Sequence, residues 1–166
     1  MRLRSSKRHL AFSLVELVVV IVIIGIIAAM AIPRFSRGTA GAGDSAVAGN
    51  LAIMRNAVRM YYAEHNSTYP TQAKFTEQLT MYTSVAGAES ATRDGTHPYG
   101  PYLVAVPPCP VGDQTDPTAV AFYTTGAFPD PPVTADTGGW IYNTTTGEIL
   151  ANTNTTDQRG KAYYKY

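Results

Sequence analysis

The sequence contains a single cysteine, few charged residues and no basic tract in its main part, and each scarcity excludes a class of protein. Cys109 stands alone among 166 residues, so the chain can form no internal disulfide. Its neighbours Pro107, Pro108 and Pro110 indicate a stiff, packed loop, and no histidine has a recognisable relation to the thiol. Charged residues make up 15% of the chain and the formal net charge is +1. A nucleic-acid partner would require a basic stripe, which this sequence does not have.

Catalytic motifs are also missing. The sequence contains no Ser/His/Asp arrangement, CxxC pair, P-loop or HExxH motif. The three histidines, His9, His65 and His97, are scattered along the chain, and we expect His65, near a predicted helix end, to lie at the surface. We therefore predict that the chain is not an enzyme.

One long hydrophobic run dominates the N-terminal part of the chain. Residues 12–32 give 21 positions, of which only Ser13 and Glu16 are polar. A helix of this length, at about 1.5 Å per residue, crosses a hydrocarbon core of roughly 30 Å. Four basic residues precede the run and predict a cytoplasmic N-terminus. A secretory signal fits less well, because its apolar part is shorter and is followed by a small-residue cleavage site.

The string AFSLVE, followed by an apolar run that ends at Pro33, resembles the N-terminus of type IV pilins and type II secretion pseudopilins. In that family a prepilin peptidase cuts on the cytoplasmic side, before the apolar run, and methylates the new amine. The resemblance implies cleavage between Ala11 and Phe12, methylation of Phe12 and a helix kink at Pro33. The family usually has glycine before the cut; alanine is the next smallest residue, and the efficiency of cleavage stays open.

Glu16 is the unexpected residue in the apolar run, because an ionised carboxylate in a bilayer costs several kcal/mol unless it is neutralised or paired. The resemblance implies that Glu16 of one subunit neutralises the Phe12 amine of a neighbour in a filament core. Such pairing would remove most of the cost of a lone buried charge. In the alternative interpretation, Glu16 lies at the headgroup level, where the helix N-terminus favours an acid.

The chain divides into four segments, judged from its composition, its periodicity and the resemblance. We predict a leader at 1–11, a transmembrane and filament-core helix at 12–33, a continuation of that helix at 34–66, and a globular antiparallel β domain at 67–166. Glycines weaken the start of the continuation, by about 1 kcal/mol each relative to alanine. Apolar residues at helical spacing then predict a stripe that packs on a sheet: Val47, Leu51, Met54, Val58 and Tyr61. Asn66 is a plausible C-cap.

The remaining pattern indicates short elements and surface loops. Residues 74–82 predict a short helix, 101–108 an extended segment, 119–125 a strand, and 140–152 a hairpin with its turn at 143–147. The tract 86–98 has the composition of a surface loop. A long helix followed by a small antiparallel sheet gives an α+β class, and the resemblance implies a pilin-like fold.

Calcium is the one cofactor that the resemblance suggests, since major pseudopilins bind it in their late loops. Asp130 and Asp136, which precede the predicted hairpin, are the candidate ligands; Asp113 and Asp116 lie in an earlier loop. Calcium prefers several oxygen ligands from flexible loops. The alternative is that these aspartates are solvated turn residues.

The function that the resemblance implies is structural. We expect a subunit of a type IV pilus-like filament, most closely the major pseudopilin of a type II secretion system, anchored in the bacterial inner membrane with its globular domain in the periplasm. The implied partners are further copies of the chain, a prepilin peptidase, an inner-membrane assembly platform, a secretion ATPase and minor pseudopilins. Major pilins often carry a C-terminal disulfide loop, which the lone Cys109 excludes. A type IV pilin for adhesion, motility or DNA uptake, and a monomeric membrane-tethered binding domain, remain alternatives.

Overall fold

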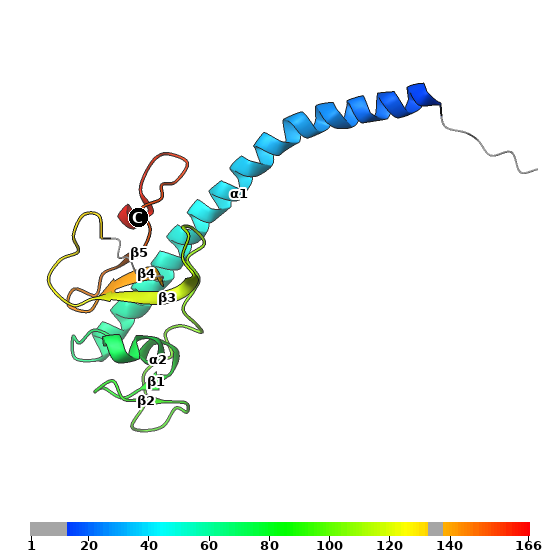
Figure 1. Cartoon of the computed structure of the whole chain (residues 1–166). Helices are drawn as coiled ribbons and strands as arrows, with labels where there is room; N and C mark the ends of the chain where they lie inside the picture. Colours follow the sequence, from blue (N-terminus) through cyan, green and yellow to red (C-terminus); the bar gives the residue numbers. More distant parts are fainter. Residues whose placement is uncertain (1–12, 133–137) are drawn as a thin grey trace, which may run out of the picture. The chain divides into compact units, whose positions relative to one another are not determined.

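The computed structural model describes residues 13–132 and 138–166. The chain forms two compact units, Met1–Thr39 and Ala40–Tyr166. The elements, in chain order, are α1 (Leu14–Glu64), η1 (Gln72–Lys74), α2 (Phe75–Thr80), β1 (Tyr82–Thr83), β2 (Glu89–Ser90), β3 (Asp116–Tyr123), β4 (Gly138–Asn143), β5 (Ile149–Ala151) and η2 (Tyr163–Lys165) (Figure 1). The predicted α+β class with a long N-terminal helix is confirmed.

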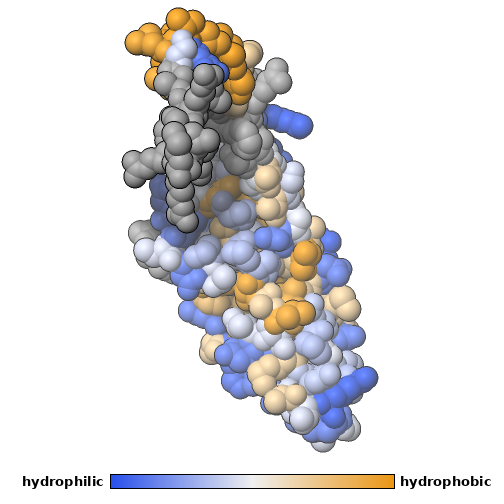
Figure 2. Space-filling view, turned by 90° about the vertical axis from the view of Figure 1, so that its right-hand side faces the viewer, coloured by the Kyte–Doolittle hydropathy of each residue, from blue (hydrophilic) through white to orange (hydrophobic). Residues whose placement is uncertain are grey.

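The first unit contains the N-terminal part of α1. Its segment Leu14–Ala31 has a mean hydropathy of 3.0 over 18 residues, and none of these residues is buried. Figure 2 shows these side chains as an apolar (orange) cluster. A helix that is apolar on every side is suited to a membrane or to the core of an assembly, because in water all of its apolar faces would be exposed to solvent at a cost in free energy.

The core of the second unit forms between α1 and the larger sheet. The predicted helix stripe is buried, since Val47, Leu51, Met54, Val58 and Tyr61 are each at most 2% exposed. They belong to one hydrophobic cluster with residues of β4 and β5, among them Trp140, Tyr142, Ile149 and Ala151. Figure 1 shows this sheet beside the part of α1 that belongs to the second unit. Burial of each large side chain contributes about 1.5–3 kcal/mol, so the stripe fixes the helix on the sheet.

The larger sheet has the strand order β3-β4-β5. Strands β4 and β5 are antiparallel, with Trp140 opposite Ala151, and they form the predicted hairpin. Strand β3, also predicted, pairs with β4 in parallel, with Tyr123 opposite Asn143. A parallel pair needs a long crossover connection, which residues 124–137 supply. The smaller sheet is the short antiparallel pair of β1 and β2.

The end of α1 is closed by a left-handed turn. Asn66 has φ of 51°, and the Ser67 N–H donates to the Tyr62 carbonyl at 3.1 Å. This bond, which spans one residue more than a helical one, is the main bond of a Schellman motif, in which asparagine tolerates the left-handed conformation. The structure thus agrees with the C-cap expected at Asn66.

The segments after the helix agree with the expectations in part. Helix α2 buries Phe75 and Leu79, as the predicted short helix requires. The segment 101–108, which we predict to be extended, forms no strand. Its backbone is held by irregular bonds instead, among them one from the Leu103 N–H to Leu79 O at 2.9 Å. The prolines at its ends have no N–H for a strand ladder, which explains the difference.

Candidate functional site

Glu16 lies in the first turn of α1. The Leu17 N–H donates to Ser13 O at 3.2 Å at the beginning of the helix. The positive end of the helix dipole favours an acidic side chain at this position. The Glu16 side chain is exposed, and within residues 13–132 and 138–166 its carboxylate has no hydrogen-bond or ion-pair partner. It is therefore available to a cation from outside this part of the chain.

The surroundings of Glu16 are apolar and uncovered. Leu14, Val15 and Leu17 are 77%, 68% and 59% exposed. The large aliphatic side chains that follow, as far as Met30, are all exposed as well. A contiguous apolar surface of this kind marks a membrane or protein interaction site. The candidate site is thus the Glu16 carboxylate at one end of an apolar helix whose exposed side chains would be stabilised by contact with lipid or with another protein.

Several predicted site residues are not placed by the structure. Ala11, Phe12 and Asp136 lie outside the described residues, so cleavage, methylation and the Asp136 half of the calcium site stay predictions. Pro33 lies within α1, which is assigned as one helix from Leu14 to Glu64. The kink expected at Pro33 also stays a prediction.

Asp130 and Asp116 are engaged in contacts within the protein, whereas Asp113 is exposed and has no side-chain partner in the described part of the chain. Asp130 Oδ1 accepts a hydrogen bond from the Tyr164 hydroxyl at 3.1 Å, and Lys165 Nζ lies 4.0 Å from Asp130 Oδ2. Asp116 Oδ1 accepts from the Thr118 hydroxyl and from the Thr118 and Ala119 N–H groups, and these bonds lower the pKa of Asp116. Among the residues the structure describes, no group of three or more His, Cys, Asp or Glu side chains could hold a metal. The calcium site stays a prediction, while Asp116 has the turn role that was its alternative.

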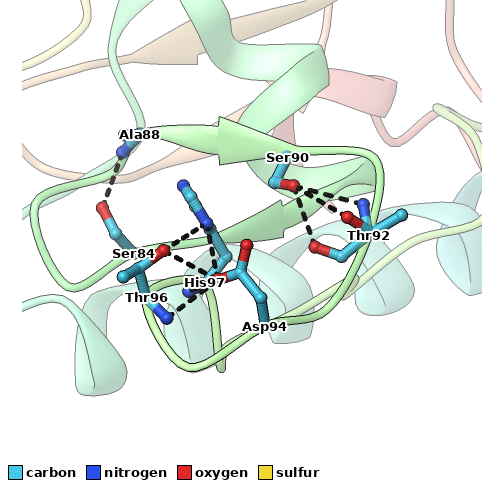
Figure 3. A network of polar contacts seen from close by, with 7 residues as sticks. All are labelled: Ser84, Ala88, Ser90, Thr92, Asp94, Thr96 and His97. Atoms are coloured by element: carbon cyan, nitrogen blue, oxygen red, sulfur yellow. Dashed lines mark hydrogen bonds and ion pairs between the residues drawn. The ribbon is translucent and has the colours of Figure 1, made fainter.

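The loop around Asp94 and His97 is a self-contained polar network (Figure 3). Asp94 Oδ1 accepts from the N–H groups of Thr96 and His97, both at 2.8 Å, and lies 3.0 Å from His97 Nδ1. The Thr96 hydroxyl donates to the same oxygen at 2.7 Å. The hydrogen bonds from Thr96 and His97 hold the pKa of Asp94 well below its usual range. These contacts stabilise the predicted surface loop, and within this loop His97 serves as a hydrogen-bond partner of Asp94 and Thr96.

His65 is buried, which corrects the expectation of a surface residue. Its side chain is 1% exposed and stacks on the Tyr61 ring, with 3.7 Å between centroids. Nδ1 lies 2.7 Å from Tyr61 O, and because a carbonyl only accepts, Nδ1 carries the proton. Nε2 then accepts from the Thr83 hydroxyl at 2.9 Å. His65 thus joins the end of α1 to β1; its position four residues after Tyr61, in line with the apolar stripe, was the signal for burial.

Cys109 is 3% exposed, in agreement with the packed loop that its proline neighbours predicted. Burial raises the pKa of the Cys109 thiol, so little thiolate is present near neutral pH. The thiol donates to Val111 O at 3.5 Å. This environment is that of a structural residue and does not activate a nucleophile.

Arg55 has a role that the sequence did not indicate. Its guanidinium donates to Ile149 O through Nε at 3.3 Å and Nη2 at 3.1 Å, and to Tyr166 O through Nη1 at 3.2 Å. The side chain therefore connects α1 to β5 and to the segment that follows it. The carbonyl partners are 94 and 111 residues away in sequence, so no local pattern could reveal them.

Comparison with protein families identifies the N-terminal segment. Residues 6–32 match the model of the prokaryotic N-terminal methylation motif. The matched stretch contains Ala11, Phe12 and Glu16 and ends one residue before Pro33. The chain matches no curated protein and no solved structure. The motif implies processing by a prepilin peptidase and assembly into filaments, and together with the exposed apolar helix it supports membrane anchoring. The chain therefore carries the N-terminal signal of type IV pilin-like proteins at the beginning of its long helix.

Proposed function

We propose that the chain is the major pseudopilin of a type II secretion system, a structural subunit whose short periplasmic fibre drives protein export. The observation that carries the proposal is the continuity of the methylation motif at residues 6–32 with an apolar helix that has no buried residue between Leu14 and Ala31. A single tethered domain would need an anchor, but it would need neither the processing motif nor a carboxylate inside the anchor.

Under this proposal, consecutive segments of the chain lie in the cytoplasm, the inner membrane and the periplasm. The leader 1–11 is cytoplasmic and is removed, residues 12–33 span the inner membrane, and the rest of the chain is periplasmic. Lipid covers the apolar helix before assembly, and the anchors of neighbouring copies cover it afterwards. Close packing can replace lipid contacts in this exchange, because both surroundings are apolar.

Glu16 has a specific role in assembly under this proposal. Cleavage creates a positive amine on Phe12, and the Glu16 carboxylate of a neighbouring copy, which has no partner in the described part of its own chain, neutralises it. Separation of the two charges in apolar surroundings is costly for both. The pair therefore fixes the axial offset between neighbouring copies, since any other register leaves both groups unpaired.

The choice of the secretion branch rests on Cys109. A lone, buried thiol cannot form the C-terminal disulfide loop that major pilins often carry. The partners of the pseudopilin would be further copies, minor pseudopilins, the inner-membrane assembly platform and the secretion ATPase.

The first experiment is the intact mass of the chain from membranes of its host. We expect a species that begins at Phe12 and is heavier by one methyl group. A full-length chain would show that Ala11 blocks the cut, and a tethered domain would then replace the filament subunit.

Deletion of the gene separates the secretion branch from a pilus. We expect exported proteins to disappear from the medium while surface pili and motility are unchanged. Loss of adhesion, motility or DNA uptake with normal export would assign the chain to the type IV pilins.

A further inference from the structure

The second unit has a basic pocket between α1 and the β4–β5 turn. Its volume is about 430 Å³, and its walls include Arg55 and Arg59 of α1, Tyr69 beyond the helix, and residues 146–149 of the hairpin. We call it the arginine pocket. All of its walls belong to the second unit, and none lies within residues 6–32, which match the methylation motif.

Of the two arginines in the pocket, Arg59 is the one without a hydrogen-bond or ion-pair partner in the described part of the chain. Arg55 donates to the main-chain oxygens of Ile149 and Tyr166. Arg59, one helical turn further, is exposed, and within the described ranges its guanidinium has no hydrogen-bond or ion-pair partner. Glu148 lines the same pocket but forms no ion pair with either arginine in this part of the chain. Arg59 is therefore free to bind an anion.

The two arginines also disfavour each other. Like charges at positions i and i+4 of a helix repel. Burial is the main reason that the pKa of Arg55 is lowered; the charge of Glu148 opposes this shift, and the charge of Arg59 adds to it. An anion bound beside Arg59 would relieve the repulsion between the two arginines.

The wall opposite the helix is rigid. Gly147 has φ of 69°, and a Cβ at this position would lie 2.1 Å from Cε1 of Tyr69, so the turn lies directly against the ring. Asn143 Oδ1 accepts from the N–H groups of Thr145 at 2.9 Å and Thr146 at 3.1 Å, which fixes the turn from inside. A pocket with fixed walls loses little conformational entropy when it binds.

We propose that the arginine pocket binds a carboxylate side chain of a second copy of this chain, with Arg59 as the charged partner. The inference rests on the proposed function, because a filament brings copies of the chain together. The planar guanidinium offers two parallel donors that match a carboxylate. Removal of the basic leader changes the formal charge of the chain from +1 to −3. Carboxylates are thus in excess on every copy, and Glu77 and Asp113 are exposed without a side-chain partner in the described part.

A photo-crosslinker at the pocket rim tests the proposal. Thr146 is exposed and lines the pocket, so p-benzoylphenylalanine in its place samples the occupant in membranes of the host. We expect a covalent dimer of the full chain on illumination. Arg59→Glu should lower its yield by more than tenfold, and Arg59→Lys should lower it less, because the charge remains while the planar fork is lost.

The matched control is Arg93→Glu, which makes the same charge change at an exposed arginine in the 86–98 loop. It should leave the dimer yield unchanged, and both charge-reversal variants should melt at the wild-type temperature. A dimer that persists in Arg59→Glu, the absence of a dimer, or a crosslink to a different protein would each overturn the proposal.

The same samples separate this inference from the proposed function. Methylation of Phe12 is measured by mass on each crosslinked sample. Methylated Phe12 without a crosslinked dimer would overturn the pocket and leave the filament subunit in place. An Arg59-dependent dimer with unmethylated Phe12 would support the proposed binding at the arginine pocket and contradict the proposed function as a filament subunit.

Discussion

At the scale of single residues, Glu16 makes the sharpest prediction, because under the proposed function its charge is needed only when copies meet. Glu16→Ala should leave membrane insertion and processing at Phe12 intact, while the amount of assembled fibre falls by about tenfold or more, as expected when an interaction of at least about 1.4 kcal/mol is lost. Fibres are quantified by sedimentation and electron microscopy, and processing by mass.

Glu16→Asp is the matched control for this variant. It keeps the charge on a shorter side chain, so it should assemble better than Glu16→Ala and less well than the wild type. Normal fibres from Glu16→Ala would contradict the pairing and favour the headgroup position for Glu16.

Two glycines allow the cost of a steric clash to be separated from the cost of backbone strain. Gly147 and Gly160 have φ of 69° and 81°, but a Cβ on Gly147 meets Tyr69 while one on Gly160 meets nothing within 4 Å. Gly160→Ala should lower the free energy of unfolding by about 1 kcal/mol through strain alone. Gly147→Ala should lower it by about 3 kcal/mol, because the ring must also move.

Urea denaturation of the full chain in detergent measures both variants. Trp140 is the only tryptophan and is fully buried, so its fluorescence reports on the core of the second unit. An equal decrease in the free energy of unfolding for the two variants would show that the Tyr69 ring and the turn move apart at no measurable cost.

At the scale of elements, Asp157 connects a turn to η2. Its Oδ1 accepts from the N–H groups of Arg159 and Lys161, both at 2.8 Å, and its Oδ2 from the Tyr166 hydroxyl at 2.7 Å. These bonds, led by the one from Tyr166, lower the pKa of Asp157 below its ordinary 3.8. The stabilisation is present above the unfolded pKa and is lost as the pH falls through the folded one.

The melting temperature of the wild type should therefore decrease as the pH is lowered from about 5 to 2. Asp157→Asn should be less stable than the wild type at neutral pH and should lose less on acidification. Asp113→Asn, which changes an exposed carboxylate without a partner in the described part, is the control and should follow the wild-type curve. Parallel curves for wild type and Asp157→Asn would remove Asp157 from the acid response.

Elements with local determinants were predictable from the sequence. The helix stripe from Val47 to Tyr61 follows from periodicity, and the β4–β5 hairpin follows from its strands and the turn at 143–147. The N-terminal motif could be recognised for the same reason, since Ala11, Phe12 and Glu16 lie within one contiguous stretch; the roles of these residues stay predictions.

Features that depend on distant parts of the chain were not predictable. The parallel pairing of β3 with β4 joins two strands that are not consecutive in a hairpin, and neither strand shows this pairing locally. The burial of His65 depends on Thr83, and the arginine pocket combines α1 with a turn near residue 147. In each case the partners are separated by many residues, so the sequence shows the side chains without their surroundings.

At the scale of the whole molecule, the boundary between the two units predicts a site of proteolysis. It falls between Thr39 and Ala40, in a stretch rich in glycine, and Arg34 and Arg37 precede it. Glycine weakens a helix, and weak segments open first to proteases. Trypsin should cut the native chain in detergent after one of these arginines.

The fragment that follows the cut should unfold cooperatively at the melting temperature of the uncut chain. It should also leave the detergent micelles, because the apolar helix stays with the other fragment. Mass spectrometry and a melting curve check both points. If trypsin instead cuts first within residues 40–166, the helix at the boundary does not open more easily than the second unit, which would contradict the prediction.

The packing of α1 on β4 and β5 has a consequence for the time course of synthesis. Arg55 and its partner Ile149 are 94 residues apart, and at about 5–20 residues per second roughly 5–20 s pass between the emergence of the two. During this interval the stripe from Val47 to Tyr61 has no sheet to cover it. The nascent chain therefore exposes the helical part of its future core for several seconds, and we expect a chaperone or the membrane surface to shield these side chains until the sheet emerges.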